Sequence, residues 1–200
     1  MNVRALASRL GTEHAPAGQA GAERSPVVSA GQAVFEREFT LLFDAHFARI
    51  FRYLDRLSGD ADVAADAVQE AFVRLFRRGV VPDDPAAWLI TVALNQFRNA
   101  VSQRNRRLAL LASSWGHGPH SDPPPSPADT AESNDDKRRV RQAIDLMPAR
   151  DRELLLLRAE GYSYREIAVA LRLHEASVGT LLARARDAFR ARYEEATDAR

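Results

Sequence analysis

Apolar side chains recur every three or four residues along most of the chain, which is the spacing of one face of an α-helix. This pattern predicts helices from Val34 to about Leu110 and again from Lys137 to Tyr193. Strict alternation of apolar and polar residues, which indicates a half-buried strand, is not seen. Between the two helical stretches, five prolines fall within the nine residues from Pro119 to Pro127. We therefore expect an all-α protein with two small helical domains joined by a flexible, proline-rich linker.

The same pattern divides the chain into five segments. Residues 1–33 are rich in Ala, Gly and Ser and lack a helical period, as is typical of a disordered tail. Residues 34–110 are the first predicted helical domain. Residues 111–136 are the predicted linker, and residues 137–193 are the second helical domain. Residues 194–200 are a short C-terminal tail.

Residues that begin helices stand at the expected places. Asp60 or Asp62 can cap a helix, because an aspartate side chain accepts hydrogen bonds from the first free backbone amides. The aspartate pair before Pro85 indicates another start, since proline is tolerated in a first turn. Ser163 and Glu166 have the spacing of a capping box, which predicts a helix that begins at the next residue after the serine.

The predicted helix 62–78 has two dissimilar faces. Its core stripe consists of Ala64, Val68, Ala71, Phe72, Leu75 and Phe76. The opposite face carries Asp66, Gln69, Glu70 and Val73. Such a face is either solvated surface or a docking surface, in which two acids and an amide meet a basic helical partner.

The next predicted helix also has two faces. Its core stripe consists of Ile90, Ala93, Leu94, Phe97 and Val101. The other face carries Trp88, Val92, Asn95, Asn99 and Ser102, with Arg98 at its flank. An aromatic platform with amides and arginines suits unstacked nucleic-acid bases. The alternative is that Trp88 simply packs against a neighbouring helix.

Residues 162–190 predict a short helix, a tight turn and a long helix, which is the outline of a DNA-reading helix-turn-helix. The buried stripe of the long helix is Val178, Leu182, Ala185 and Phe189, and its outer face is Ala176, Thr180, Ala183 and Asp187. Small side chains let a helix sit deep in the major groove, where Thr180 can touch a thymine methyl or a base edge. Arg184 and Arg186 can hold phosphates.

The composition of the chain argues against several other classes of function. A net charge of +1 argues against histone-like coating of DNA, and the absence of cysteine excludes disulfides and thiolate metal sites. The chain lacks an apolar run of membrane-spanning length and a signal-peptide core, so we expect no membrane insertion and a cytoplasmic location. The five histidines are scattered, and glycine-rich phosphate loops and nucleophile elbows are missing. The sequence therefore predicts a protein that is not an enzyme and needs no metal or cofactor.

Taken together, these segments resemble a known family. "DAVQEAFVRLFRR" (66–78) followed by "PAAWLITVALNQFRNAVSQRNRR" (85–107) is similar to region 2 of bacterial RNA polymerase sigma factors. "AIDLMPARDRELLLLRAEGYSYREIAVALRLHEASVGTLLARARDAFR" (143–190) is similar to their region 4. With these two regions alone, the chain resembles the extracytoplasmic-function (ECF) group.

The resemblance implies partners and site residues. It implies that Asp66, Gln69, Glu70 and Val73 dock on the β′ clamp helices of core RNA polymerase, and that Trp88, Asn95, Arg98 and Asn99 capture the −10 element of promoter DNA. It further implies that Ser177, Thr180, Arg184 and Arg186 read the −35 element near the β flap. An anti-sigma protein is a further candidate partner.

The chain departs from the family pattern at two points in the helix-turn-helix. The turn, where the family usually has glycine, holds Arg172, and Gly179 stands where a basic residue is usual. The alternative function is a stand-alone helix-turn-helix regulator with a helical partner-binding domain. A purely protein-binding module is a further alternative, but it leaves the arginine-rich stretch 98–107 without a role.

Overall fold

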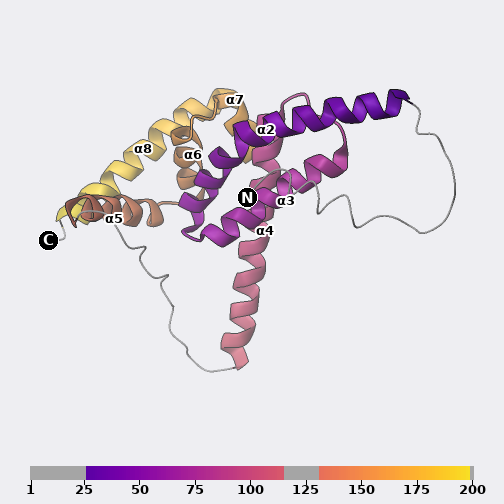
Figure 1. Ribbon diagram of the computed structural model, residues 1–200. Coiled ribbons are helices and arrows are strands. Elements are labelled where there is room, and N and C mark those ends of the chain that lie inside the picture. The colour runs from indigo at the N-terminus through magenta and orange to yellow at the C-terminus, as the bar shows by residue number, and fades with distance from the viewer. Residues whose placement is uncertain (1–25, 115–130, 199–200) are drawn as a thin grey trace.

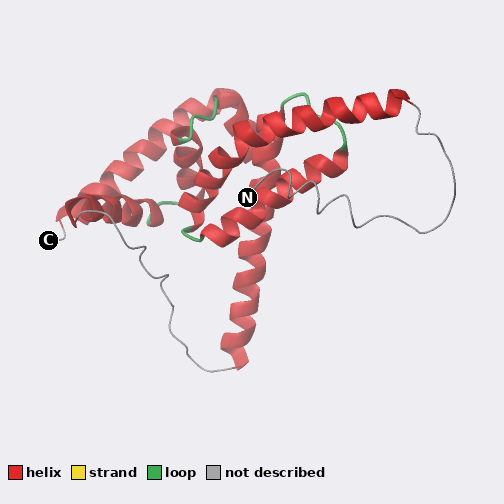
Figure 2. Cartoon of the chain, viewed as in Figure 1, coloured by secondary structure: helices red, strands yellow, loops and turns green. Residues whose placement is uncertain are grey.

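The computed structural model describes residues 26–114 and 131–198, which are helical apart from short turns (Figure 2). No strand occurs in these two ranges, in agreement with the all-α prediction. The helices are α2 (Pro26–Ser58), α3 (Ala61–Arg78), α4 (Pro85–Ser114), α5 (Ala131–Asp145), α6 (Ala149–Ala159), α7 (Tyr164–Leu171) and α8 (Glu175–Asp198).

Helices α2, α3 and α4 form an N-terminal bundle around a core rich in phenylalanine. The rings of α2 and α3 that contact one another are Phe35, Phe39, Phe43, Phe47, Phe72 and Phe76. Phe39 meets Phe72 edge-to-face, with ring centroids 6.0 Å apart. Such pairs add about 0.5–1.5 kcal/mol to the burial of their apolar area. This cluster fixes α3 against α2 and leaves the opposite side of α3 outside the core.

The ends of α3 and α4 follow the local signals in the sequence. The Asp60 side chain accepts a hydrogen bond from the Val63 backbone amide at 3.2 Å, so Asp60 rather than Asp62 is the N-cap of α3. Gly79 ends α3 in the left-handed conformation, at φ 68°, which glycine adopts without steric cost. Asp84 caps α4 by accepting from the Ala87 amide at 3.0 Å.

Several helices extend beyond the predicted ends. Helix α2 begins at Pro26, inside the segment predicted to be a tail, and proline is well suited to a first helical turn. Helix α4 reaches Ser114, and α5 begins at Ala131. Only residues 115–130 of the predicted linker therefore lie outside the described residues. Acidic side chains favour a helix N-terminus, and the acid-rich start of α5 includes Asp135, which pairs with Arg139 at 2.7 Å.

Helices α5 to α8 form a C-terminal bundle. The capping box predicted at Ser163 and Glu166 is present in both directions, and α7 begins at Tyr164 as expected. Val178, Leu182 and Ala185 bury the inner face of α8, whereas Phe189 is only half-buried. Helices α7 and α8 therefore form the predicted helix-turn-helix.

The two bundles lie against each other, with α6 beside α2 and α7 beside α4 (Figure 1). The C-terminal half of α4 projects away from both bundles. None of the described helices is long and apolar enough to cross a membrane. His14, His117 and His120 lie outside the described residues.

Candidate functional site

The face of α3 opposite its core stripe combines three polar residues with one apolar residue. We call it the α3 surface: Asp66, Gln69, Glu70 and Val73. Asp66 is exposed and makes no ion pair with any residue that the structure describes. The Arg74 guanidinium donates to the Glu70 carboxylate at 2.9 Å, one helical turn away. Val73 is half-buried and packs against the core. An acidic surface with an apolar neighbour can bind a basic helical partner.

The polar face of α4 combines an aromatic ring with amides. Trp88 is half-buried against the core, and the Arg78 guanidinium lies 5.9 Å from its ring centroid, within the range of a cation–π contact. Asn95 is half-buried and Asn99 is exposed. Trp88 therefore has a packing role, and the arginine beside it adds positive charge to the same end of the face.

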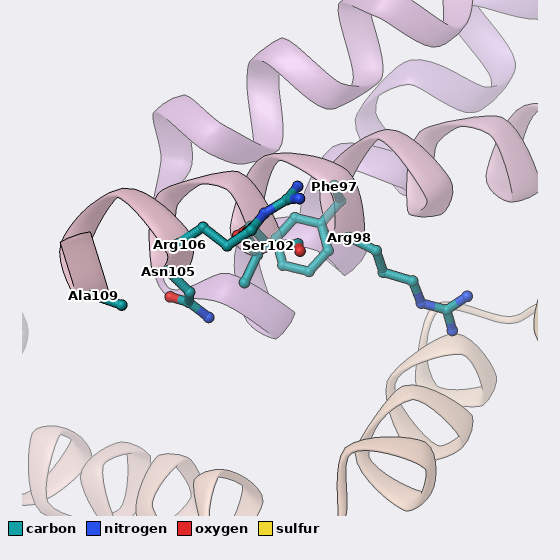
Figure 3. A pocket seen from close by; sticks show the side chains of 7 residues that line it. Phe97, Arg98, Ser102, Asn105, Arg106 and Ala109 are labelled. Atoms are coloured by element: carbon teal, nitrogen blue, oxygen red, sulfur yellow. Dashed lines mark hydrogen bonds between the residues drawn. The ribbon is translucent and has the colours of Figure 1, made fainter.

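Arg98 lies at the flank of this face but points away from it. Its side chain leaves the groove formed by Phe97, Ser102, Asn105 and their neighbours and extends toward the C-terminal bundle (Figure 3). There it donates to both carboxylate oxygens of Glu153 in α6, at 2.7 and 3.2 Å. A bidentate arginine–carboxylate pair has well-defined geometry. In this structure the Arg98 guanidinium is therefore paired with Glu153 of the same chain.

The outer face of α8 is open. Ser177, Thr180, Arg184 and Arg186 are all exposed, as is the small side chain of Ala183. Helix α8 packs against α5, α6 and α7 of its own bundle, and these four outer residues lie on its solvent-exposed side. A methyl, a hydroxyl and flanking guanidinium groups on one exposed helix face suit contact with base edges and phosphates.

The turn before α8 contains a strained residue. Arg172 adopts φ 55°, the left-handed region in which a residue with a Cβ is disfavoured. Arg172 is the C-cap of α7, and its backbone amide donates a hydrogen bond to the Val169 carbonyl at 3.4 Å. Beyond the turn, a Cβ added to Gly179 would lie 3.5 Å from the Tyr164 ring, which is ordinary contact. Gly179 therefore has room for a side chain.

A group of arginines on α2, which was not predicted from the sequence, contacts the C-terminal bundle. Glu160 follows α6, and its carboxylate accepts from Arg52 at 3.1 Å and from Arg56 at 2.5 Å. Arg49 donates to the Glu160 backbone carbonyl at 2.9 Å and lies 3.6 Å above the Tyr162 ring. We call these four residues, Arg49, Arg52, Arg56 and Glu160, the arginine clamp. Its only sequence signal is a basic stripe on α2 spaced by three, four and seven residues.

Two tyrosines are buried near the clamp. Tyr53 and Tyr162 have no exposed surface, and neither hydroxyl has a hydrogen-bond partner in the described chain. Burial raises the pKa of the Tyr53 hydroxyl well above its usual value, and the Glu153 charge adds to the effect. Burial likewise raises the pKa of Tyr162. Both hydroxyls therefore stay protonated and neutral.

Two helical bundles, the second with an exposed helix-turn-helix, define a DNA-binding protein of the all-α class. Comparison with known proteins identifies the family. Residues 42–107 match the model of sigma-70 region 2, and residues 137–189 match that of sigma-70 region 4. The chain belongs to the ECF RNA polymerase sigma factors, a family of transcription initiation factors that are not enzymes.

Individual relatives support this assignment. The chain is 31% identical to the ECF sigma factor SigL of Mycobacterium tuberculosis over 146 residues, covering 70% of this chain and 80% of SigL. It is 31% identical to SigE of Mycolicibacterium smegmatis over 151 residues, covering 72% of this chain and 57% of SigE. It spans only 33% of the probable sigma factor RfaY of Xanthomonas campestris.

A solved structure has the same fold. The sigma factor RpoE of Bartonella quintana, crystallised with the anti-sigma factor NepR, aligns with a TM-score of 0.56 and 20% sequence identity. The alignment covers 80% of this chain and 97% of that chain. The arrangement of helices in this chain is therefore that of a known sigma factor.

Proposed function

We propose that this chain binds core RNA polymerase and directs it to a specific class of promoters. In this proposal the α3 surface docks on the β′ clamp helices, the polar face of α4 captures the −10 element, and the outer face of α8 reads the −35 element near the β flap. The observation that supports it best is the presence of both sigma regions, in order, each with an exposed face at the matching position. The factor would act in the cytoplasm, where the polymerase is.

The three contacts are unequal. The candidate −35 residues of α8 include two arginines, Arg184 and Arg186, and the net charge of the chain is +1. Because each phosphate contact contributes affinity by releasing counterions, so few cations predict weak binding by the free chain. Joining several weak contacts through one polymerase raises the effective affinity of each. Promoter selection would therefore depend on the polymerase complex.

The second candidate function, a stand-alone helix-turn-helix regulator, leaves the α3 surface without a role. Such a regulator binds its operator without polymerase, usually as a dimer. A further candidate partner is an anti-sigma protein, since the RpoE structure contains one.

The α3 surface provides the test of the proposal. Changing Asp66→Arg and Glu70→Arg together should abolish co-purification with core polymerase, because both acids would then repel a basic partner. Asp66 makes no ion pair with a described residue, and the Glu70–Arg74 pair is an exposed one. Such pairs are worth about 0.3–0.5 kcal/mol on a helix, so the fold should persist.

The matched control reverses the same two residue types elsewhere. Glu38→Arg with Asp44→Arg, on exposed positions of α2, produces the same change in net charge and should leave core binding intact. Circular dichroism establishes that both variants are folded. Equal core binding by the two folded variants would exclude the α3 surface as the docking site.

A further inference from the structure

We infer that Arg74 is a positioning residue for the α3 surface: it holds the Glu70 carboxylate in one orientation, while Gln96 of α4 holds Arg74. The inference rests on the proposed function, because it concerns how the α3 surface presents Glu70 to core polymerase. It adds Arg74 and Gln96 to a docking surface that is otherwise formed by one face of a single helix.

The Arg74 guanidinium lies between acceptors on two different helices. Its Nε donates to Oε1 of Glu70 at 2.9 Å, one turn earlier on α3. From α4, the Gln96 amide faces the same guanidinium, and with its oxygen toward Arg74 it accepts from Nε at 2.8 Å and from Nη1 at 3.1 Å. A guanidinium has only donors, so this is the orientation of the amide that satisfies both groups. Arg74 therefore bridges α3 and α4.

The contact with Gln96 distinguishes this arginine from an ordinary surface charge. The side chains of Arg74 and Glu70 are 52% and 40% exposed, and an exposed pair of this kind is weak because holding two long side chains together costs entropy. Gln96 is half-buried, and its helix packs directly against α3. The planar guanidinium is thus fixed from the α4 side, and its orientation fixes that of Glu70.

The bridge leaves Glu70 able to bind a partner. Arg74 donates to Oε1, and none of the described residues hydrogen-bonds the second carboxylate oxygen, Oε2. An ionised carboxylate accepts on both oxygens, so a donor of the partner can take Oε2 while Arg74 stays in place. A side chain that is already ordered before binding loses less entropy when the complex forms.

Gln96 also joins the bridge to the helix of the candidate −10 face. At roughly 100° per residue, Gln96 and Arg98 lie at opposite flanks of the face that carries Asn95. Arg98 is paired with Glu153 on its side, and Gln96 accepts from Arg74 on the other. A change at Gln96 should therefore affect the docking surface, although Gln96 lies on another helix.

Charge alone predicts the opposite effect for Arg74. A cation beside Glu70 reduces the negative potential of the α3 surface, so its removal should strengthen the binding of a basic partner. A positioning role predicts that the same removal weakens binding, because the Glu70 side chain is then free to adopt several rotamers. The sign of the change in core affinity therefore distinguishes the two roles.

Titration of the full chain against core polymerase measures this sign. Arg74→Ala should weaken core binding by about two- to tenfold, the size expected for leaving one long side chain unordered before binding. Gln96→Ala should weaken it in the same direction by a smaller factor, since the Glu70 pair remains. Arg74→Lys should recover part of the loss, because lysine reaches Glu70 but lacks the planar fork. Circular dichroism establishes that each variant is folded.

Arg77→Ala is the matched control. Arg77 is an exposed arginine of α3, seven residues from Glu70 and so on the same side of the helix, and it makes no ion pair with a described residue. Its removal changes the net charge as Arg74→Ala does, and should leave core affinity unchanged or raise it. In a Glu70→Gln background, Arg74→Ala should have little further effect, because the carboxylate that it positions is absent.

Proton exchange in the free chain tests the bridge without polymerase. In nitrogen-15 NMR spectra, the Nε–H proton of Arg74 should exchange with water more slowly than that of Arg77, since only the former is hydrogen-bonded within the described chain. Glu70→Ala and Gln96→Ala should each make the Arg74 exchange faster. Equal exchange rates at the two arginines of the unaltered chain would contradict the bridge.

Three results of the titrations would overturn the positioning role. One is unchanged or stronger core binding by Arg74→Ala, and another is an equal loss in Arg77→Ala. The third is a full effect of Arg74→Ala in the Glu70→Gln background. A failure of the proposed function gives a different pattern: Asp66→Arg with Glu70→Arg then retains core binding, while the slow exchange at Arg74 persists in the free, unaltered chain.

Discussion

At the scale of single residues, the turn of the helix-turn-helix contains the clearest case of backbone strain. Arg172 holds a left-handed conformation that glycine adopts freely. Arg172 departs from the family pattern, in which this position is usually glycine, and its left-handed φ shows that the departure costs backbone strain.

Arg172→Gly should stabilise the protein. The left-handed conformation costs a residue with a Cβ about 1–2 kcal/mol. Glycine offsets part of this gain, since its greater freedom in the unfolded chain costs roughly 0.5–1 kcal/mol. We expect the free energy of unfolding in urea to rise by up to about 1.5 kcal/mol. Arg184→Gly, in the middle of α8, should lower it by about 1 kcal/mol. A loss of stability in both variants would contradict this account of the turn.

His46 predicts a dependence of stability on pH. Burial, followed by the nearby charge of Arg49, lowers the pKa of His46 below 6.5, although Glu166 and Asp84 act in the opposite direction. The folded chain therefore binds this proton less readily than the unfolded chain. The free energy of unfolding should fall as pH drops from about 6.5 through the folded pKa, by less than about 1.4 kcal/mol per pH unit.

Denaturant titrations at pH 7.0 and 5.5 measure this effect. His46→Gln should reduce the difference between the two pH values, because glutamine does not titrate. His174→Gln, at an exposed position, serves as the control and should retain the difference. An unchanged difference in the His46 variant would show that other groups cause the pH dependence.

At the scale of helices, the sequence predicted the starts of helices that have a capping residue more accurately than it predicted the lengths of helices. Caps such as Asp60 and Ser163 act on the nearest backbone amides, so their signals are local and were read correctly. The start of α2 at Pro26 was not predicted, because residues 26–33 are mostly small and lack an apolar period. Without a core-facing stripe, the only sequence signal for such a helix start is intrinsic helix propensity, which is weak.

Different side chains of α8 should determine the sequence specificity and the affinity of DNA binding. In the proposed function Thr180 contacts a base edge or a thymine methyl, so Thr180→Ala should change the preferred −35 sequence, by about 1–3 kcal/mol at one position. Arg184 is proposed to contact a phosphate, so Arg184→Ala should weaken all sequences about equally. Transcription from a randomised −35 library measures both. A preferred −35 motif that is identical with and without Thr180→Ala would assign specificity to other contacts.

At the scale of the whole molecule, the sequence predicted two helical domains but not their contact. The amphipathic pattern shows which face of a helix is buried, because it depends on neighbours within one or two turns. It does not show which helix covers a given polar face. Arg52 and Glu160 are 108 positions apart, and nothing in the sequence distinguishes either of them from an ordinary surface charge. Their pairing follows from the packing of complete bundles.

Run-off transcription with purified core polymerase on a library of genomic fragments tests the central claim, that the chain is a promoter-specificity factor, most directly. Core polymerase with the chain should produce discrete transcripts whose start sites share a pair of upstream motifs, and core alone should not. The Asp66→Arg, Glu70→Arg variant should abolish these transcripts, whereas the Glu38→Arg, Asp44→Arg control should retain them. If a folded chain yields no transcripts beyond those of core alone, it does not direct promoter-specific initiation.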